Sequence, residues 1–186
     1  VKRMLAYSSI AHSGYALVGV IASAVGGESL LGASGTLFYI FAYTLMTLGT
    51  FGFVCLFEVK EDTQLTVDEL KGFAKRDPWT AALFSILLLS LAGIPPLAGF
   101  FGKLFIFSAA VKQGLFWVAI WGVIGSVISV YYYLRPIVNM YMSDSKGTPA
   151  VYSKQLTHFS VGLMAMLVIF VGILAEPFYQ FIVTLL

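Results

Sequence analysis

The sequence contains few charges, one cysteine and two histidines. Charged residues make up 11% of the 186 residues and hydrophobic ones 59%, which excludes a soluble domain and indicates a multi-pass membrane protein. The single cysteine, Cys55, excludes an internal disulfide and a cysteine cluster for a metal or an iron–sulfur centre. The two histidines lie far apart in the sequence and form no obvious metal site. The sequence also lacks a glycine-rich phosphate loop, a nucleophile–base pair and a basic patch suited to nucleic acid.

Long apolar runs predict the fold class, an all-α membrane protein. A helix needs about 20 residues to cross the hydrocarbon core, and five runs are long enough. We expect a single transmembrane domain over 1–186, and we expect it to be part of a longer protein because Val1 falls inside an apolar pattern. The predicted spans are about 4–25, 35–57, 79–111, 115–134 and 156–178.

The third span, 79–111, is too long to be one helix. An unbroken helix of this length would reach roughly 50 Å, whereas the hydrocarbon core is about 30 Å thick. Pro95 and Pro96 supply no backbone N–H and disfavour helix at the residue before them. Unwound backbone survives at membrane depth only where protein or a wet cavity surrounds it. We therefore predict two half-helices, about 79–92 and 100–111, joined by an unwound segment at Gly93–Gly99.

Lys103 follows this break and is predicted to be a buried ionisable group. The end of the half-helix near Lys112 is roughly 13 Å away along the axis, which is too far for the side chain to snorkel. Burial and the positive end of a half-helix destabilise the charged form of the amine, whereas carbonyls of the unwound segment stabilise it. A lysine whose charged and neutral forms are balanced in this way suits a proton carrier. The alternative is a structural lysine held by loose carbonyls. Broken helices with a charge at the break are typical of transporters.

Two other spans carry polar stripes. Ser8, His12 and Tyr15 share one helical face, so His12 could relay a proton or could only hydrogen-bond a neighbouring helix. In the second span, Tyr43 and Thr47 belong to a hydroxyl stripe that could form a polar path or could only join helices.

In the fourth span, a face of small residues suits close helix packing and consists of Gly122, Ser126 and Ser129.

Basic residues predict the orientation in the membrane. With five spans, nine basic residues lie on one side and only Lys112 on the other, so we expect the N-terminal end in the cytoplasm and Leu186 in the periplasm of a bacterial inner membrane. Trp79 and Tyr131–Tyr133 are expected as aromatic rings at the cytoplasmic interface. The nine basic residues are Lys2, Arg3, Lys60, Lys71, Lys75, Arg76, Arg135, Lys146 and Lys154.

Two local patterns predict helix starts near the third span. Thr66 with Glu69 three residues later is the pattern of a capping box for a short surface helix. Asp77 followed by Pro78 predicts the cap and first turn of the third span.

Two segments resemble the antiporter-like membrane subunits of respiratory complex I. Val1–Tyr15 is similar to a signature segment of these subunits, and Ser90–Lys103 is similar to their second broken helix. Within that family, Ala6–His12 and Tyr131–Arg135 most resemble the subunit N branch, whose mitochondrial counterpart is subunit 2. The resemblance covers nearly the whole chain. It implies a fourteen-span fold with two inverted five-helix repeats, of which these are the last five spans and the broken one is the twelfth.

The resemblance also implies roles. Lys103 would be the proton-carrying lysine of the second half-channel, and the glutamate–lysine pair and central lysine of the family would lie upstream of this chain. Some relatives carry a histidine or lysine in the span before the broken helix, where this chain has Tyr43, Thr44 and Thr47, so water would have to complete the path.

The expected function is therefore proton translocation within an NADH-quinone oxidoreductase, without redox catalysis in this chain. The chain would bind no cofactor, because NADH, FMN, iron–sulfur clusters and quinone would belong to other parts of the assembled complex. The expected partners are other membrane-arm subunits and the lipid bilayer, and no nucleic acid. Two alternatives stay open: a subunit of a multisubunit cation/proton antiporter, or a structural membrane subunit without its own ion path.

Overall fold

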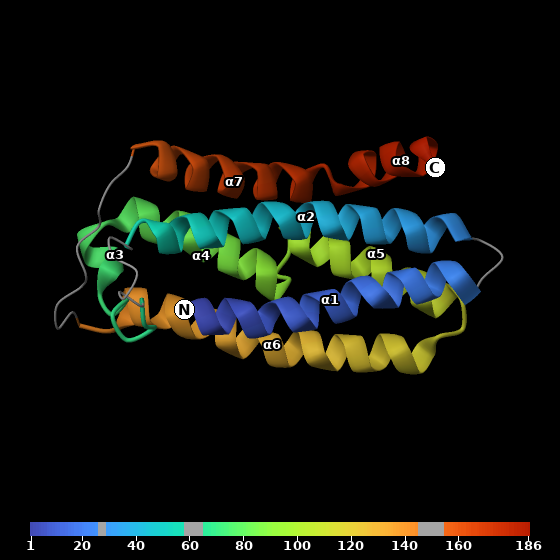
Figure 1. Ribbon diagram of the computed structural model, residues 1–186, viewed down its shortest axis with the longest axis horizontal. Coiled ribbons are helices and arrows are strands. Elements are labelled where there is room, and N and C mark those ends of the chain that lie inside the picture. The colour runs from blue at the N-terminus through green and yellow to red at the C-terminus, as the bar shows by residue number, and fades with distance from the viewer. Residues whose placement is uncertain (26–28, 58–64, 145–154) are drawn as a thin grey trace.

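The computed structural model describes residues 1–25, 29–57, 65–144 and 155–186, and within these ranges all regular structure is helical (Figure 1). The helices are α1 (Lys2–Val25), α2 (Ser29–Cys55), α3 (Phe73–Arg76), α4 (Pro78–Ala92), α5 (Ala98–Lys112), α6 (Phe116–Met142), α7 (Gln155–Ile173) and α8 (Ala175–Leu185).

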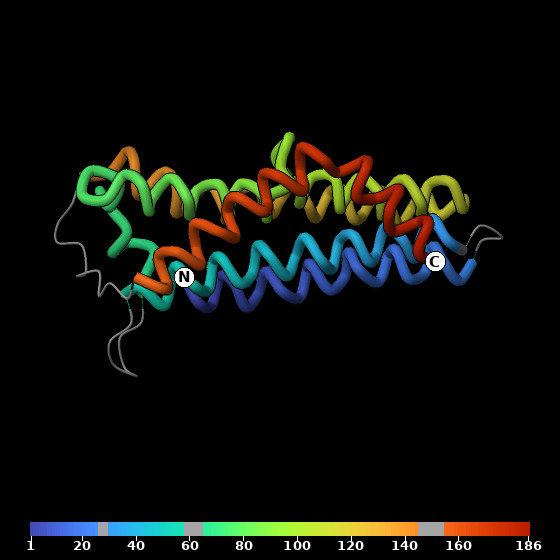
Figure 2. Tube along the Cα trace, turned by 90° about the horizontal axis from the view of Figure 1, so that it is seen from above, coloured from blue at the N-terminus to red at the C-terminus, as the bar shows by residue number. Residues whose placement is uncertain are grey.

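Four of these helices are long and apolar enough to cross a membrane: α1, Leu30–Cys55 of α2, α6 and α7. Their long axes run along the same direction of the bundle (Figures 1 and 2). Helices α4 and α5 have 15 residues each and follow one another along that direction, so that together they extend over most of the bundle (Figure 1). That this pair forms a fifth crossing stays a prediction.

The predicted break of the third span is confirmed. Gly93 ends α4 with a left-handed backbone (φ 87°), and its N–H donates to the carbonyls of Leu89 (3.1 Å) and Ser90 (3.0 Å). Leu97 is extended, and α5 begins at Ala98, two residues earlier than predicted. The predicted cap at the other end of α4 is also confirmed, because the Asp77 carboxylate accepts from the Thr80 N–H at 3.0 Å.

Close backbone contacts hold the break in place. The Gly99 N–H donates to the Ser90 hydroxyl at 3.1 Å, and a Cβ atom on Gly99 would lie 1.9 Å from the Ser90 carbonyl oxygen. On the other side, α7 passes directly over the break, where a Cβ atom on Gly172 would lie 2.2 Å from the Pro96 carbonyl oxygen. These contacts fix the two ends of the unwound segment against protein, whereas Pro95 and Pro96 at its centre are exposed.

Two helices have other bounds than the predicted spans, whose limits in the membrane stay predictions. The fourth span was predicted to end at 134, but α6 continues to Met142 through Pro136, because its last turns pack against the segment that precedes α4. The fifth span was predicted as one helix over 156–178, but the helix is interrupted at Leu174. Pro177 explains this interruption, since it has no N–H for the carbonyl four residues earlier and its ring would clash there.

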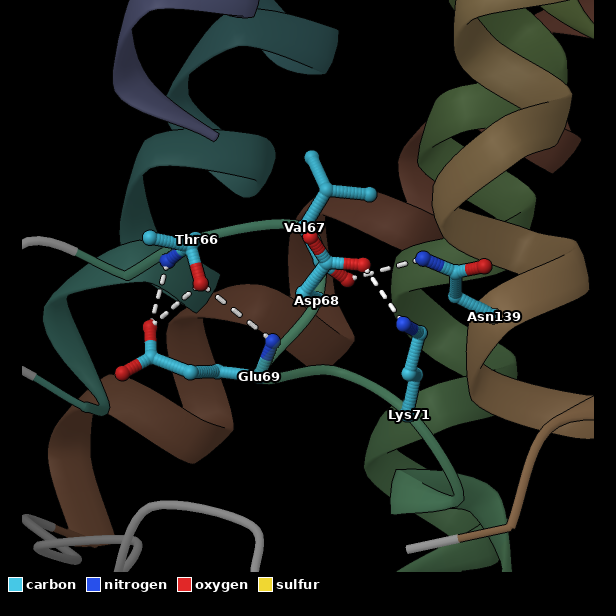
Figure 3. A network of polar contacts seen from close by, with 6 residues as sticks. All are labelled: Thr66, Val67, Asp68, Glu69, Lys71 and Asn139. Atoms are coloured by element: carbon cyan, nitrogen blue, oxygen red, sulfur yellow. Dashed lines mark hydrogen bonds and ion pairs between the residues drawn. The ribbon is translucent and has the colours of Figure 1, made fainter. Parts of the chain in front are cut away.

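The capping box is present, although the helix predicted after it is not. The Glu69 carboxylate accepts from the N–H (2.6 Å) and the hydroxyl (2.8 Å) of Thr66, as Figure 3 shows. The chain then turns at Gly72, which has a positive φ of 71°, so helix α3 begins only at Phe73. Asn139 of α6 holds this turn, because its side-chain amide donates to the Val67 carbonyl at 3.0 Å (Figure 3). Its backbone carbonyl accepts from the Gly72 N–H, also at 3.0 Å.

The contact between α7 and the break predicts a difference between two glycines of the same helix. Gly172→Ala should lower the thermal midpoint of the purified protein, because overpacking costs about 1–3 kcal/mol. Gly162→Ala is the matched control, since its Cβ atom would meet only the Leu83 side chain at 3.8 Å. Equal midpoints for the two variants would contradict the tight contact over the break.

Candidate functional site

Lys103 lies in the second turn of α5 and is 5% exposed, which confirms that it is buried. Its side chain reaches back to the end of α4. The Nζ atom donates to the carbonyl oxygens of Leu91 (3.0 Å) and Ala92 (3.1 Å) and to the hydroxyl of Ser126 on α6 (3.0 Å). Gly93 leaves room for the amine, because a Cβ atom there would lie 3.2 Å from Nζ.

The surroundings of Lys103 match a cation that has no acidic partner. A protonated lysine has three N–H donors, and these three acceptors satisfy all of them. The two carbonyls stand at the C-terminal, partly negative end of α4. The ring centroid of Tyr15 lies 5.2 Å from Nζ, within the range of a cation–π contact. Among the described residues, no carboxylate forms an ion pair with this amine.

The Ser126 hydroxyl differs from the other two partners. A carbonyl oxygen can only accept, whereas a hydroxyl can accept from the charged amine and can donate to the lone pair of the neutral one. The site can therefore hold Lys103 in either protonation state without leaving a buried polar group unpaired. The sequence placed Ser126 on a packing face, and this second role was missed.

His12 forms a second polar group at the centre of the bundle. Its Nδ1 lies 2.6 Å from the Tyr39 hydroxyl and its Nε2 lies 3.0 Å from the Tyr133 hydroxyl. The Tyr133 hydroxyl is also hydrogen-bonded to Ser8. The four side chains thus form one chain of hydrogen bonds from α2 through α1 to α6. Tyr43 stacks on the imidazole with the ring centroids 4.6 Å apart.

The structure brings some of the predicted site residues together and leaves one of them outside the site. Lys103 and His12 both pack against the ring of Tyr15, so they belong to one site. Tyr43 reaches the site through its contact with His12. Thr47 does not: its carbonyl accepts from the Thr50 hydroxyl at 3.1 Å, and among the described residues no side-chain hydrogen bond joins it to Lys103 or His12.

Tyr133 corrects the prediction of an interfacial aromatic group. Tyr131 is 72% exposed, as an interfacial ring would be, but Tyr133 is 1% exposed and faces His12. The helical period could have separated the two, because Ser126, Ser129 and Tyr133 fall on one face at i, i+3 and i+7. Within the described residues, no group of three or more His, Cys, Asp or Glu side chains could hold a metal ion.

The sequence is similar to membrane subunits of known complexes. Residues 1–129 match the family described as "NADH:quinone oxidoreductase/Mrp antiporter, TM". Over 179 residues the chain is 48% identical to NADH-quinone oxidoreductase subunit N of Bdellovibrio bacteriovorus, a match that covers 96% of this chain and 37% of the relative. The chain thus spans only about a third of the length of this relative, and it matches the C-terminal part.

Two solved complexes contain chains with a similar fold. A chain of respiratory complex I from Thermus thermophilus with bound aureothin gives a TM-score of 0.82 at 29% identity, and covers 97% of this chain and 39% of its own length. A chain of the Mrp complex from Dietzia sp. DQ12-45-1b gives a TM-score of 0.83 at 19% identity, and covers 97% of this chain and 41% of its own length. The second likeness shows the fold alone.

The hydrogen bonds of His12 predict which tyrosine hydroxyl matters for stability. Tyr39→Phe should destabilise the protein by about 1–3 kcal/mol, because it leaves a buried ring nitrogen of His12 without a partner. Tyr43→Phe should have little effect, because Tyr43 contacts His12 through its ring face. The thermal midpoints of the two purified variants measure this difference. A larger loss for Tyr43→Phe would contradict the assigned hydrogen bond.

Proposed function

Because the chain belongs to the NADH:quinone oxidoreductase/Mrp antiporter family of membrane subunits, we propose that it is the C-terminal part of a proton-translocating subunit N of an NADH-quinone oxidoreductase. In this proposal the pair α4–α5 is a fifth, broken crossing, and further spans upstream complete a fourteen-span subunit. The redox chemistry, with NADH, FMN, iron–sulfur clusters and quinone, takes place in other subunits.

The observation that carries the proposal is the environment of Lys103. The two carbonyls would suit a structural lysine as well as a proton carrier, and the Ser126 hydroxyl is the partner that favours a proton carrier, because it can pair with the charged and with the neutral amine. In the charged state the amine donates to all three. In the neutral state one donor is lost, and the Ser126 hydroxyl rotates to donate to the free lone pair. Protons can thus be loaded and released without rearranging the helices.

The driving force comes from outside this chain. Because Lys103 has no counter-ion among the described residues, its charge is sensitive to charges that appear in adjacent helices, and at low effective dielectric that influence extends over several ångströms. We assign the electrostatic signal to the neighbouring membrane-arm subunits of the complex. His12 either passes protons on the path to Lys103 or only fixes the surrounding tyrosines through its hydrogen bonds.

The location in the proposal is a bacterial inner membrane. The N-terminal end of α1 faces the cytoplasm and Leu186 the periplasm, following the distribution of basic residues. Large apolar side chains point outward along the bundle, which suits contact with lipid tails or with the helices of partner subunits. Examples are Ile10 on α1, Trp117 and Trp121 on α6, and Phe170 on α7.

A cation/proton antiporter subunit is the second candidate, since the matching family includes Mrp antiporters and the Mrp chain has the same fold. The relative at 48% identity bears the name of the oxidoreductase subunit, which favours the first candidate. The two differ in what drives transport. Proton movement that requires NADH and quinone supports the first, and proton movement driven by a cation gradient alone supports the second.

Substitution of Lys103 tests the proposal. In the assembled complex, Lys103→Gln should reduce proton translocation per quinone and lower coupled quinone reductase activity by about tenfold, which corresponds to ~1.4 kcal/mol. Lys112→Gln at the end of α5 is the control and should leave both unchanged. A purely structural lysine would give the opposite pattern, in which Lys103→Gln lowers assembly while the assembled enzyme keeps its proton yield.

A further inference from the structure

Helix α8 follows α7 along the bundle after the interruption at Leu174 (Figures 1 and 2). Two contacts with α5 give the level of this interruption. A Cβ atom on Gly172 would lie 2.8 Å from the backbone nitrogen of Ala98, where α5 begins. Seven residues later on both helices, the rings of Tyr179 and Phe105 stack with their centroids 4.2 Å apart. Helix α7 therefore ends beside the break, and α8 runs alongside the first turns of α5.

Glu176 lies between these two contacts and is exposed on the outside of the bundle. Its level corresponds to Gly102 on α5. In the proposed topology Lys112 and the exposed Trp117 mark the nearer membrane interface, which is roughly 15 Å further along the axis. A glutamate side chain has only two methylene groups and cannot reach so far. The carboxylate therefore faces outward inside the hydrocarbon core, where lipid tails cannot stabilise its charge.

The described residues satisfy only part of this carboxylate. The side-chain amide of Gln180 donates to its Oε1 atom at 2.8 Å, and no ion pair within the described residues includes Glu176. The position in the first turn of α8 favours a negative charge. The second carboxylate oxygen and the amide oxygen of Gln180 are both acceptors. A group that completes this site must therefore be a donor, and a cation suits it best.

Large apolar side chains surround this polar pair on the same outward side. Phe170, Ile173 and Phe181 are 60%, 66% and 58% exposed. Polar groups between aromatic and aliphatic residues are typical of the centre of a protein interface, whereas charged residues are rare on a surface that meets lipid. We call this surface the α7–α8 face, and it consists of Phe170, Ile173, Glu176, Gln180 and Phe181.

The place of α7 and α8 in the bundle indicates what covers this face. Both helices lie on the side opposite to α6, with α2 between them and α1 (Figure 1). In the proposed subunit the upstream spans join the chain at α1, away from the α7–α8 face. Lipid headgroups stay at the interface and cannot bring a cation to this depth. A helix of an adjacent subunit can do so, since polar side chains commonly join helices within membranes.

We propose that the α7–α8 face binds a transmembrane helix of a neighbouring subunit, and that a lysine or arginine of that helix pairs with Glu176 and Gln180. A single ion pair at this depth fixes the register of two helices, because any shift along the axis leaves a charge unpaired in lipid. The inference rests on the proposed function in that it requires a complex of several subunits, which both candidate functions provide.

Photo-crosslinking tests the partner. In the assembled complex, replacement of Phe181 by p-benzoylphenylalanine should give an adduct with a different subunit, within about two helical turns (~11 Å) of a lysine or arginine in a membrane-spanning helix. Replacement of Phe178 is the matched control and should give adducts with α2, because its ring packs on Phe38 and Phe41. An adduct of position 181 with lipid, with the upstream part of the same subunit, or with a helix that has no such cation would overturn the proposal.

Charge reversal tests the ion pair. Glu176→Lys should raise the rate at which the subunit leaves the detergent-solubilised complex by about tenfold or more, because it brings like charges together. Changing the crosslinked partner cation to glutamate should restore retention of Glu176→Lys, and a merely structural role at the start of α8 would not give this rescue. Ser108→Ala is the control and should leave retention unchanged, since Ser108 is exposed on α5 and bonded to its own helix. Failure of the double charge swap to restore retention would overturn the ion pair.

These outcomes are distinguishable from failure of the proposed function, because retention of the subunit is measured without turnover. If Lys103→Gln retains pumping while the charge swap restores retention, only the proposed function fails. If Lys103→Gln abolishes pumping and the charge swap restores nothing, only the role of the α7–α8 face fails.

Discussion

The end of α4 and the amine of Lys103 satisfy each other's hydrogen bonds. When α4 stops at Gly93, the carbonyls of its last turn lose their helical partners, and an unpaired carbonyl in an apolar setting costs several kcal/mol. An unpaired ammonium would cost more still. The two hydrogen bonds from Nζ to Leu91 and Ala92 remove both penalties at once. The broken helix therefore needs a donor at this place, and the lysine needs the break.

Helix α6 links this interaction to the rest of the polar interior. It supplies Ser126 to the amine and Tyr133 to His12, two turns apart on one face. Its last turns also hold the segment before α4 through Asn139. A shift of α6 would therefore change the environment of Lys103, the hydrogen bonds of His12 and the start of the broken helix together.

The sequence predicts those features of the fold and the site that depend on residues close together along the chain. The prolines at 95 and 96 and the glycine at 93 predict the break, the distance from Lys103 to the helix end predicts its burial, and Asp77 predicts a cap. The errors arise where contacts between helices determine where a helix ends or which side chain is buried. Pro136 argues against a helix whose last turn is nevertheless held by the contact of Asn139 with the segment before α4. Tyr133 shares a helical face with Ser126 and Ser129, but its burial depends on the helices that pack against that face.

The account depends on an amine that exchanges its proton inside the bundle, and nitrogen NMR of the intact complex measures this directly. With ¹⁵N-labelled lysine and the signal assigned by its loss in Lys103→Gln, the Nζ shift reports whether the amine is charged. The account predicts that this signal moves between the charged and neutral positions when the pH is varied over the range in which the complex stays assembled. A signal that stays at the charged position throughout would contradict it.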